Sequence, residues 1–182
     1  MLMNENRLLR YLLVKLNLGY YVQILSQTFK YSTAILVKTM RLECPVLERG
    51  NRLPVKYTCK GKGISPPLSI IGIPEGTQSM VIIMLDPDAP LKTFIHWLLY
   101  DIPPDIDYIE ENEKRYKQGR NSLFGVGYFP PCPVGGEHRY IFTVYAIDKK
   151  LNLKEKSTFW KVKKVVRNHI IQSAELVTFF KK

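Results

Sequence analysis

The chain has 182 residues, of which 46% are hydrophobic and 24% are charged, and this balance predicts one domain with a buried core. Its net charge of +11 is typical of proteins that bind nucleic acid or anionic membranes. The basic residues are spread along the chain, however, and the densest group, at positions 161–167, is too sparse for a nucleic-acid-binding arm. No specific nucleic-acid partner is therefore expected.

Residues 1–39 are predicted to be an N-terminal extension to a domain at residues 40–182. Leucines recur at helical spacing between positions 8 and 16, but basic residues such as Lys15 interrupt the apolar stretch. The pattern fits neither a transmembrane span nor a secretory signal. Three interpretations stay open: an interfacial amphipathic anchor, an extra packed element, or a stretch upstream of a true start at Met40. The last two are favoured.

The first part of the domain is expected to be short strands joined by turns. Residues 53–59 are predicted to be a strand and residues 60–63 a turn, and residues 65–70 form the next extended segment. The twelve prolines and eleven glycines of the chain favour a sheet-rich architecture with many corners.

An apolar run at residues 80–85 is the central strand of this prediction. Its almost unbroken apolar character predicts a strand covered on both faces. It ends at Asp86, where two prolines forbid ladder hydrogen bonds, and residues 94–100 are predicted to return as a second strand. A carboxylate at the end of a core strand needs a polar partner, and His96 on the returning strand is a candidate.

Beyond this pair, residues 107–119 are polar and charged and are predicted to form an exposed loop. The next segment, residues 125–140, is stiffened by prolines and is followed by a strand at residues 141–147. Because side chains alternate along a strand, His138 and Tyr140 point the same way at its beginning. They supply the second half of a predicted pocket.

The tail, residues 160–180, is predicted to be a helix with one buried stripe, capped by Ser157 or Thr158. His169 lies near this stripe and is interpreted as a packing or surface residue without chemistry. Three cysteines, Cys44, Cys59 and Cys132, are odd in number and widely spaced. They predict neither a disulfide framework nor a metal site, and so a reducing, cytoplasmic setting.

Three motifs in fixed order, residues 86–90, residues 96–97 and residues 127–140, resemble the phosphatidylethanolamine-binding protein family. Its bacterial and archaeal branch, the Raf kinase inhibitor-like proteins, is most similar, and the resemblance extends from residue 40 to the end. It implies a predominantly β fold: a sandwich of antiparallel sheets with a C-terminal helix. Members of the family are described as protease inhibitors or kinase regulators.

The resemblance also implies a small cavity for a phosphate-like anion or a phospholipid head group such as phosphorylethanolamine. The residues carried over to it are Asp86, His96, His138 and Tyr140, with Gly127, Pro130 and Pro131 as its rim. Phe129 and Pro130 stand where similar proteins often carry glycines, and Val134 replaces a usual proline, so the rim shape is expected to differ. Phe179 or Phe180 lies near a C-terminal tyrosine of some relatives, and a phenylalanine cannot donate that hydroxyl hydrogen bond.

The chemistry of these residues suits an anion independently of the resemblance. Two imidazoles and a phenol can donate to an anionic oxygen in a partly desolvated hollow. We expect Asp86 to orient a histidine and to favour its protonated form. Phosphate affinity should then weaken as the pH rises through the histidine titration.

The same residues give less support to other functions. Two histidines and an aspartate could ligate a metal, but neither a metal nor a cofactor is expected. A nucleophilic enzyme lacks support, because no serine lies in a Gly-x-Ser-x-Gly elbow and Cys132 has no evident oxyanion partner. The sequence thus predicts a non-enzymatic, anion-binding inhibitor or regulator of a protein partner. The alternative is an inhibitor of a serine protease or carboxypeptidase that acts through a surface independent of the pocket. A homodimer stays open.

Overall fold

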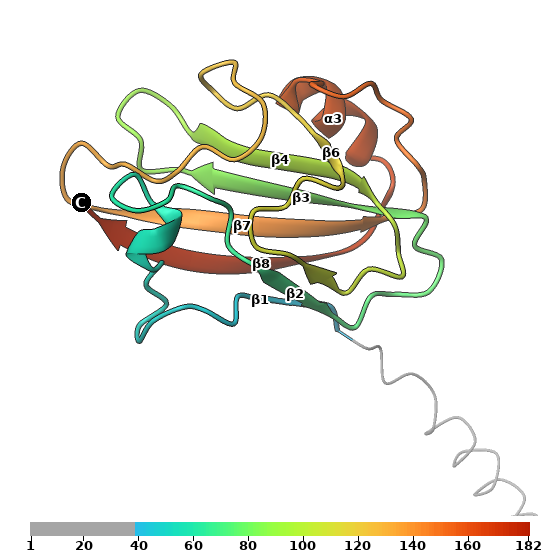
Figure 1. Ribbon diagram of the computed structural model, residues 1–182. Coiled ribbons are helices and arrows are strands. Elements are labelled where there is room, and N and C mark those ends of the chain that lie inside the picture. The colour runs from blue at the N-terminus through green and yellow to red at the C-terminus, as the bar shows by residue number, and fades with distance from the viewer. Residues whose placement is uncertain (1–38) are drawn as a thin grey trace, which may run out of the picture. The chain divides into compact units, whose positions relative to one another are not determined.

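The computed structural model describes residues 39–182 (Figure 1). The predicted extension at residues 1–39 lies outside the described residues except for Thr39, so the interpretations of it stay predictions. Within the described part, no helix is long and apolar enough to cross a membrane.

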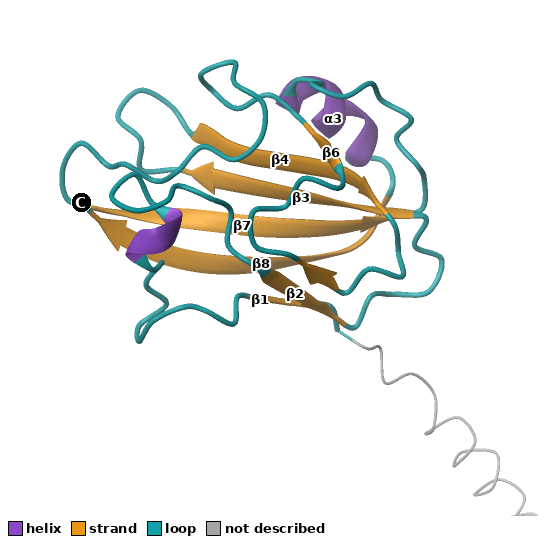
Figure 2. Cartoon of the chain, in the orientation of Figure 1, coloured by secondary structure: helices purple, strands orange, loops and turns teal. Residues whose placement is uncertain are grey.

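Two antiparallel sheets form the body of the domain (Figure 2). The smaller sheet has the order β1 (Arg41–Glu43), β2 (Leu68–Ile71), β5 (Tyr108–Ile109). The larger sheet has the order β6 (Lys117–Gln118), β4 (Phe94–Ile102), β3 (Ser79–Asp86), β7 (Glu137–Ile147), β8 (Ile170–Lys181). Within residues 39–182, two short helices accompany them, the 3₁₀ helix η1 (Val55–Tyr57) and α3 (Phe159–Val166). The predicted predominantly β fold of antiparallel sheets is confirmed.

The large sheet is covered on both faces, which explains the continuous apolar run in β3. Met80, Ile82 and Met84 pack in one core with residues of the small sheet, whereas Val81 and Ile83 pack in a second core with α3. Each face therefore buries alternate residues of the same strand. The predicted strands at residues 80–85, 94–100 and 141–147 are confirmed as parts of β3, β4 and β7, and β7 begins earlier than predicted, at Glu137.

A β-bulge near the beginning of β4 aims one side chain. Met84 is paired with Trp97 and Leu85 with Ile95, so His96 is an extra residue between the two pairs. A bulge of this kind redirects the side chain of the extra residue. The ring of His96 consequently lies against Tyr140, with ring centroids 5.2 Å apart.

The predicted C-terminal helix is wrong for most of its length. Helix α3 ends at Val166, and β8 pairs with β7 from Ile170 to Lys181. In β8 the residues that pack toward the core recur at every second position, namely Ala174, Leu176, Thr178 and Phe180. This period of two places the same segment in a strand, and the helical stripe was coincidental beyond residue 166.

Two shorter predictions also need correction. Residues 53–59 do not form a strand, because the chain turns through η1 directly after Pro54. Residues 107–119 are more than an exposed loop, since they contain β5 and β6. They also contain Glu113, which is buried and accepts hydrogen bonds from the guanidinium of Arg115.

Candidate functional site

Three neighbouring strands bring the predicted polar residues to the same end of the large sheet. Asp86 is the last residue of β3, whereas His96 and His138 lie near the beginnings of β4 and β7. Because both neighbours are antiparallel to β3, its end and their beginnings meet at one sheet edge. Tyr140 lies two residues further along β7 than His138, on the same face.

Asp86 makes its closest imidazole contact with His138. The Asp86 Oδ2 atom lies 2.8 Å from His138 Nδ1 and 4.0 Å from His96 Nε2. Asp86 is only 4% exposed and also accepts a hydrogen bond from the backbone N–H of Asp88. Since a carboxylate can only accept, Nδ1 of His138 carries the proton. The structure thus gives His138, rather than His96, as the histidine that Asp86 orients.

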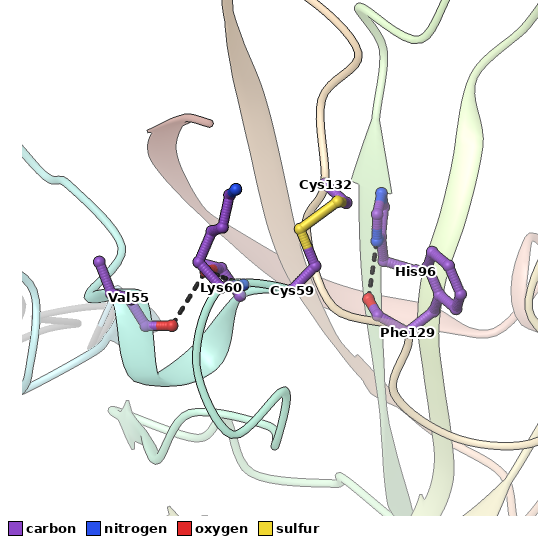
Figure 3. Close-up of a disulfide and its surroundings, with 7 residues drawn as sticks. Val55, Cys59, Lys60, His96, Phe129 and Cys132 are labelled. Carbon is purple, nitrogen blue, oxygen red and sulfur yellow. Dashed lines mark hydrogen bonds between the residues drawn. A yellow bond between two sulfur atoms is a disulfide. The ribbon is translucent and has the colours of Figure 1, made fainter.

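His96 is oriented by the backbone of the loop that precedes β7. Its Nδ1 donates to the carbonyl oxygen of Phe129 at 2.8 Å (Figure 3). Burial lowers the pKa of His96 below its usual 6.5, although the Phe129 carbonyl and Asp86 act in the opposite direction. The neutral ring with its proton on Nδ1 is therefore favoured, and Nε2 is left for other contacts.

Tyr140 brings a buried hydroxyl next to both rings. Its side chain is fully buried, and its ring centroid lies 5.2 Å from that of His96 and 6.5 Å from that of His138. Its hydroxyl finds no hydrogen-bond partner among residues 39–182. Burial also raises its pKa well above 10, so it remains a donor. A buried hydroxyl without a partner is uncommon in folded proteins and often marks a site for water or a ligand.

A cavity of about 170 Å³ opens beside these residues, and we call it the anion cavity after the ligand that the sequence analysis predicted. Its lining consists of Asp86, Ala89, Pro90, Phe94, His96, Phe129, Cys132, Pro133, Val134 and His138. Two residues at which the sequence departs from the family pattern, Phe129 and Val134, are thus part of the wall. The polar part of the lining is concentrated in one carboxylate and two imidazoles.

The three residues predicted as the rim lie outside this lining. Gly127 is buried with φ +90°, and a side chain there would collide with Gln118. Pro130 packs beside Gly63, and the Pro131 carbonyl accepts a hydrogen bond from the backbone of Cys59 at 3.0 Å. These residues shape the loop behind the cavity wall rather than the wall itself.

A disulfide between Cys59 and Cys132 anchors that wall (Figure 3). The expectation that the cysteines form no disulfide is therefore wrong for this pair. The pair was hidden because its members are 73 residues apart and because Cys44, which is buried and free, makes the count odd. The bond ties the cavity-lining loop to the segment after η1. The cytoplasmic location loses its supporting argument and stays a prediction.

The sequence reasoning also missed an ion pair between two residues that are chain neighbours of cavity-lining residues. The guanidinium of Arg139 contacts both carboxylate oxygens of Asp88, at 2.7 and 3.0 Å. These hydrogen bonds lower the pKa of Asp88 to about 2. The arginine next to His138 is therefore engaged by a protein carboxylate, and the histidines are left as the groups in the lining that can carry positive charge. Across residues 39–182, no three potential metal ligands are grouped to hold an ion.

Comparison with known proteins gives matches along nearly the whole described region. A family model described as phosphatidylethanolamine-binding protein matches residues 44–181. A UPF0098 protein of Pyrococcus abyssi is 43% identical over 140 residues, which are 71% of this chain and 79% of that protein. A UPF0098 protein of Methanothermobacter thermautotrophicus is 37% identical over 150 residues, which are 79% of this chain and 99% of that protein.

Solved structures give the same result. A phosphatidylethanolamine-binding protein homologue from Chlamydia trachomatis matches with a TM-score of 0.76 and 36% identity, over 80% of this chain and 99% of its own. YbcL of E. coli, described as a member of the mammalian PEBP family, matches with a TM-score of 0.72 and 26% identity, over 79% of this chain and 98% of its own.

Proposed function

The chain belongs to the phosphatidylethanolamine-binding protein family, and from that premise we propose that it binds a small phosphate-like anion in the anion cavity without converting it chemically. The observation that carries the proposal is the pair of buried histidines, each with its Nδ1 proton engaged by the protein. Their two Nε2 atoms are the imidazole groups left for a ligand. The hydroxyl of Tyr140 has no partner in the described part of the chain, and although Tyr140 is not part of the lining, its ring lies against those of His96 and His138.

The protonation of these groups selects the ligand. A protonated Nε2 donates to a phosphate oxygen, whereas a neutral Nε2 can only accept from a hydroxyl of the phosphate itself. Asp86 opposes a fully ionised phosphate by like-charge repulsion unless a histidine is protonated. Each productive arrangement therefore needs a proton on the ligand or on a ring, and affinity should fall as the pH rises.

The size and setting of the cavity favour a head group over a whole lipid. A volume of about 170 Å³ suits a phosphate or phosphorylethanolamine and leaves the rest of a phospholipid outside. The desolvated apolar wall around Phe94 and Phe129 strengthens each charge-assisted hydrogen bond that a bound anion makes.

The proposal includes no enzymatic step. Cys132 lines the cavity, but it is held in a disulfide and cannot act as a thiolate. We propose instead that the protein regulates or inhibits a protein partner such as a kinase or protease, in the cytoplasm. The two most exposed large apolar side chains of the described region support a partner at this end: Val134 on the cavity wall and Leu91 on the adjacent loop.

The test is a titration of the full chain with phosphate and with phosphorylethanolamine, followed through the histidine imidazole resonances by NMR. Resonances of His96 and His138 should shift and saturate, while those of His169 should not. His138→Ala should weaken phosphate binding by about tenfold or more. His169→Ala is the matched control, because His169 is paired with Asp148 and does not line the cavity.

Two outcomes would contradict parts of the proposal. Shifts that are equal for all three histidines, or affinity unchanged by His138→Ala, would remove the anion site. Inhibition of a serine protease or carboxypeptidase that survives His138→Ala would separate the inhibitory surface from the cavity.

A further inference from the structure

A second hollow lies on the other side of the first residues of β4. Phe94 and His96 line the anion cavity, whereas Thr93 and Ile95 line this hollow of about 250 Å³. We call it the Arg120 groove, and its lining is Lys92, Thr93, Ile95, Arg120, Asn121, Ser122, Phe124, Thr158, Phe159 and Trp160. No residue is shared with the lining of the anion cavity.

The charges of the Arg120 groove have a single sign. Lys92 and Arg120 belong to its lining, and no carboxylate does. Neither cation forms an ion pair with another residue in the described part of the chain. The ammonium of Lys163 lies 5.6 Å from the ring centroids of both Phe159 and Trp160, which adds a third cation beside the groove. An anionic ligand would therefore be attracted by these cations, and no carboxylate in the lining would oppose it.

Two aromatic side chains stand exposed at the lip of this groove. Phe124 is 76% exposed and Trp160 is 71% exposed. Phe124 also has φ +64°, a left-handed conformation that is unfavourable for a bulky residue. A strained residue with an exposed apolar side chain is not explained by packing, and such strain is typical of ligand-contacting positions.

The loop that presents Phe124 is held by its own hydrogen bonds. The side-chain oxygen of Asn121 accepts from the backbone N–H groups of Leu123 and Gly125, at 3.0 and 3.1 Å. Nη1 of Arg120 donates to the carbonyl oxygen of Phe124 at 2.8 Å. The loop is thus ordered before any ligand arrives, and little conformational entropy is lost on binding.

We propose that the Arg120 groove binds an acidic segment of a partner protein, with one bulky apolar side chain of that segment inserted between Phe124 and Trp160. The carboxylates of the segment pair with Lys92 and Arg120, and the apolar side chain fills the hollow. A hollow flanked by two aromatic residues accommodates a single side chain, whereas a lipid surface is matched by side chains that project from a convex face. This inference adds a partner class to the proposed regulatory function and is independent of anion binding.

The chain carries its own reporter for the test. Trp97 is fully buried and Trp160 is largely exposed, so a change in tryptophan emission on binding reports Trp160. The probes are synthetic peptides in which glutamates flank one central residue that is varied through all amino acids except tryptophan, whose own emission would mask that of Trp160. Peptides with a central phenylalanine, leucine or methionine should give a saturable blue shift. Those with central glycine or alanine, and those with lysines in place of glutamates, should not.

Variants locate the binding to the groove. Lys92→Gln and Phe124→Ala should each weaken the peptide by about tenfold, while Lys114→Gln, at an exposed lysine outside the groove, should not. Circular dichroism verifies that each variant is folded, and phosphate binding should be unchanged in Lys92→Gln, which separates this test from that of the anion cavity.

The inference would be overturned by either of two results. One is that no acidic peptide of the series shifts the emission, or that the shift is indifferent to Lys92→Gln and Phe124→Ala. The other is that vesicles of phosphatidylcholine with phosphatidylserine give the shift and the peptides do not, which would make the groove a lipid-binding surface.

Discussion

The anion cavity and the Arg120 groove lie on opposite sides of the same few residues of β4, yet they satisfy their polar groups in different ways. In the cavity, Asp86, His96 and His138 are almost fully buried, and each has a hydrogen-bond partner within the protein. In the groove, Lys92 faces solvent, and Arg120 bonds only backbone in the described part of the chain.

This difference predicts which substitutions should change the stability of the protein and which should change only its affinity for a ligand. The protein loses stability when a buried polar group is deprived of its partner, whereas an ion pair between exposed charges rarely contributes more than about 1 kcal/mol. Substitutions in the cavity should therefore change both stability and anion affinity, and substitutions in the groove should change peptide affinity alone. The following measurements test this contrast.

The largest effect is expected from the disulfide that anchors the cavity wall. Replacing both Cys59 and Cys132 by serine should lower the free energy of unfolding by about 4 kcal/mol, because the bond closes a long loop in the unfolded chain. Phosphate affinity should fall as well, since Cys132 lines the cavity, whereas peptide binding in the groove should persist. Urea unfolding monitored by circular dichroism measures the stability change.

A loss of less than about 1 kcal/mol would contradict the assigned role. It would mean that other contacts, such as the hydrogen bond between the Cys59 N–H and the Pro131 carbonyl, suffice to hold the loop.

A smaller and opposite effect is expected at Tyr140. Tyr140→Phe removes a buried hydroxyl that lacks a partner, so stability should stay unchanged or rise by about 1 kcal/mol, while phosphate affinity should drop. Tyr100→Phe is the matched control. Tyr100 is equally buried, but its hydroxyl donates to the Lys154 carbonyl at 2.6 Å, and its loss should cost about 1 kcal/mol.

The pair of unfolding and phosphate titrations decides the role of this hydroxyl. If Tyr140→Phe destabilised the protein as much as Tyr100→Phe and left phosphate affinity intact, the Tyr140 hydroxyl would be a structural group and not part of the anion site.

The site residues were predictable because they lie at the ends of strands with clear patterns. The apolar run before Asp86 and the alternation from His138 to Val144 define two strands and the faces of their side chains. Which of the two histidines contacts Asp86 was not predictable. That choice depends on the bulge at His96, and a one-residue change of register has no signature in a single sequence.

Other features were out of reach for the same reason. The pairing of Cys59 with Cys132 depends on how η1 lies against the loop before β7, which is a long-range contact. The tail could be taken for a helix because apolar residues between positions 162 and 177 satisfy a period of 3.6 as well as a period of two in their second half. Pairing with β7 decided between the two.

The smallest effect, a pH dependence, distinguishes the two hollows once more. Burial lowers the pKa of His96 below 6.5, so in acid the unfolded chain takes up a proton before the folded protein does. The contribution of His96 to the free energy of unfolding is therefore fully present above about pH 6.5. It is lost as the pH falls below that value, by no more than about 1.4 kcal/mol per pH unit for one group. Asp88, with a pKa lowered to about 2, contributes in the same direction only below its ordinary 3.8.

The two pH windows are therefore separate, and unfolding free energies at about pH 7 and about pH 5.5 isolate the histidine. His96→Asn should flatten this difference, while His169→Ala, at the half-exposed histidine paired with Asp148, should leave most of it. Phosphate affinity should rise as the pH falls over the same interval, because the His96 ring gains a proton. The lining of the Arg120 groove contains no histidine. Peptide affinity there should therefore stay constant between about pH 7 and about pH 5.5. An equal pH response of both ligands would show that a global change, and not the buried imidazoles, governs binding in the cavity.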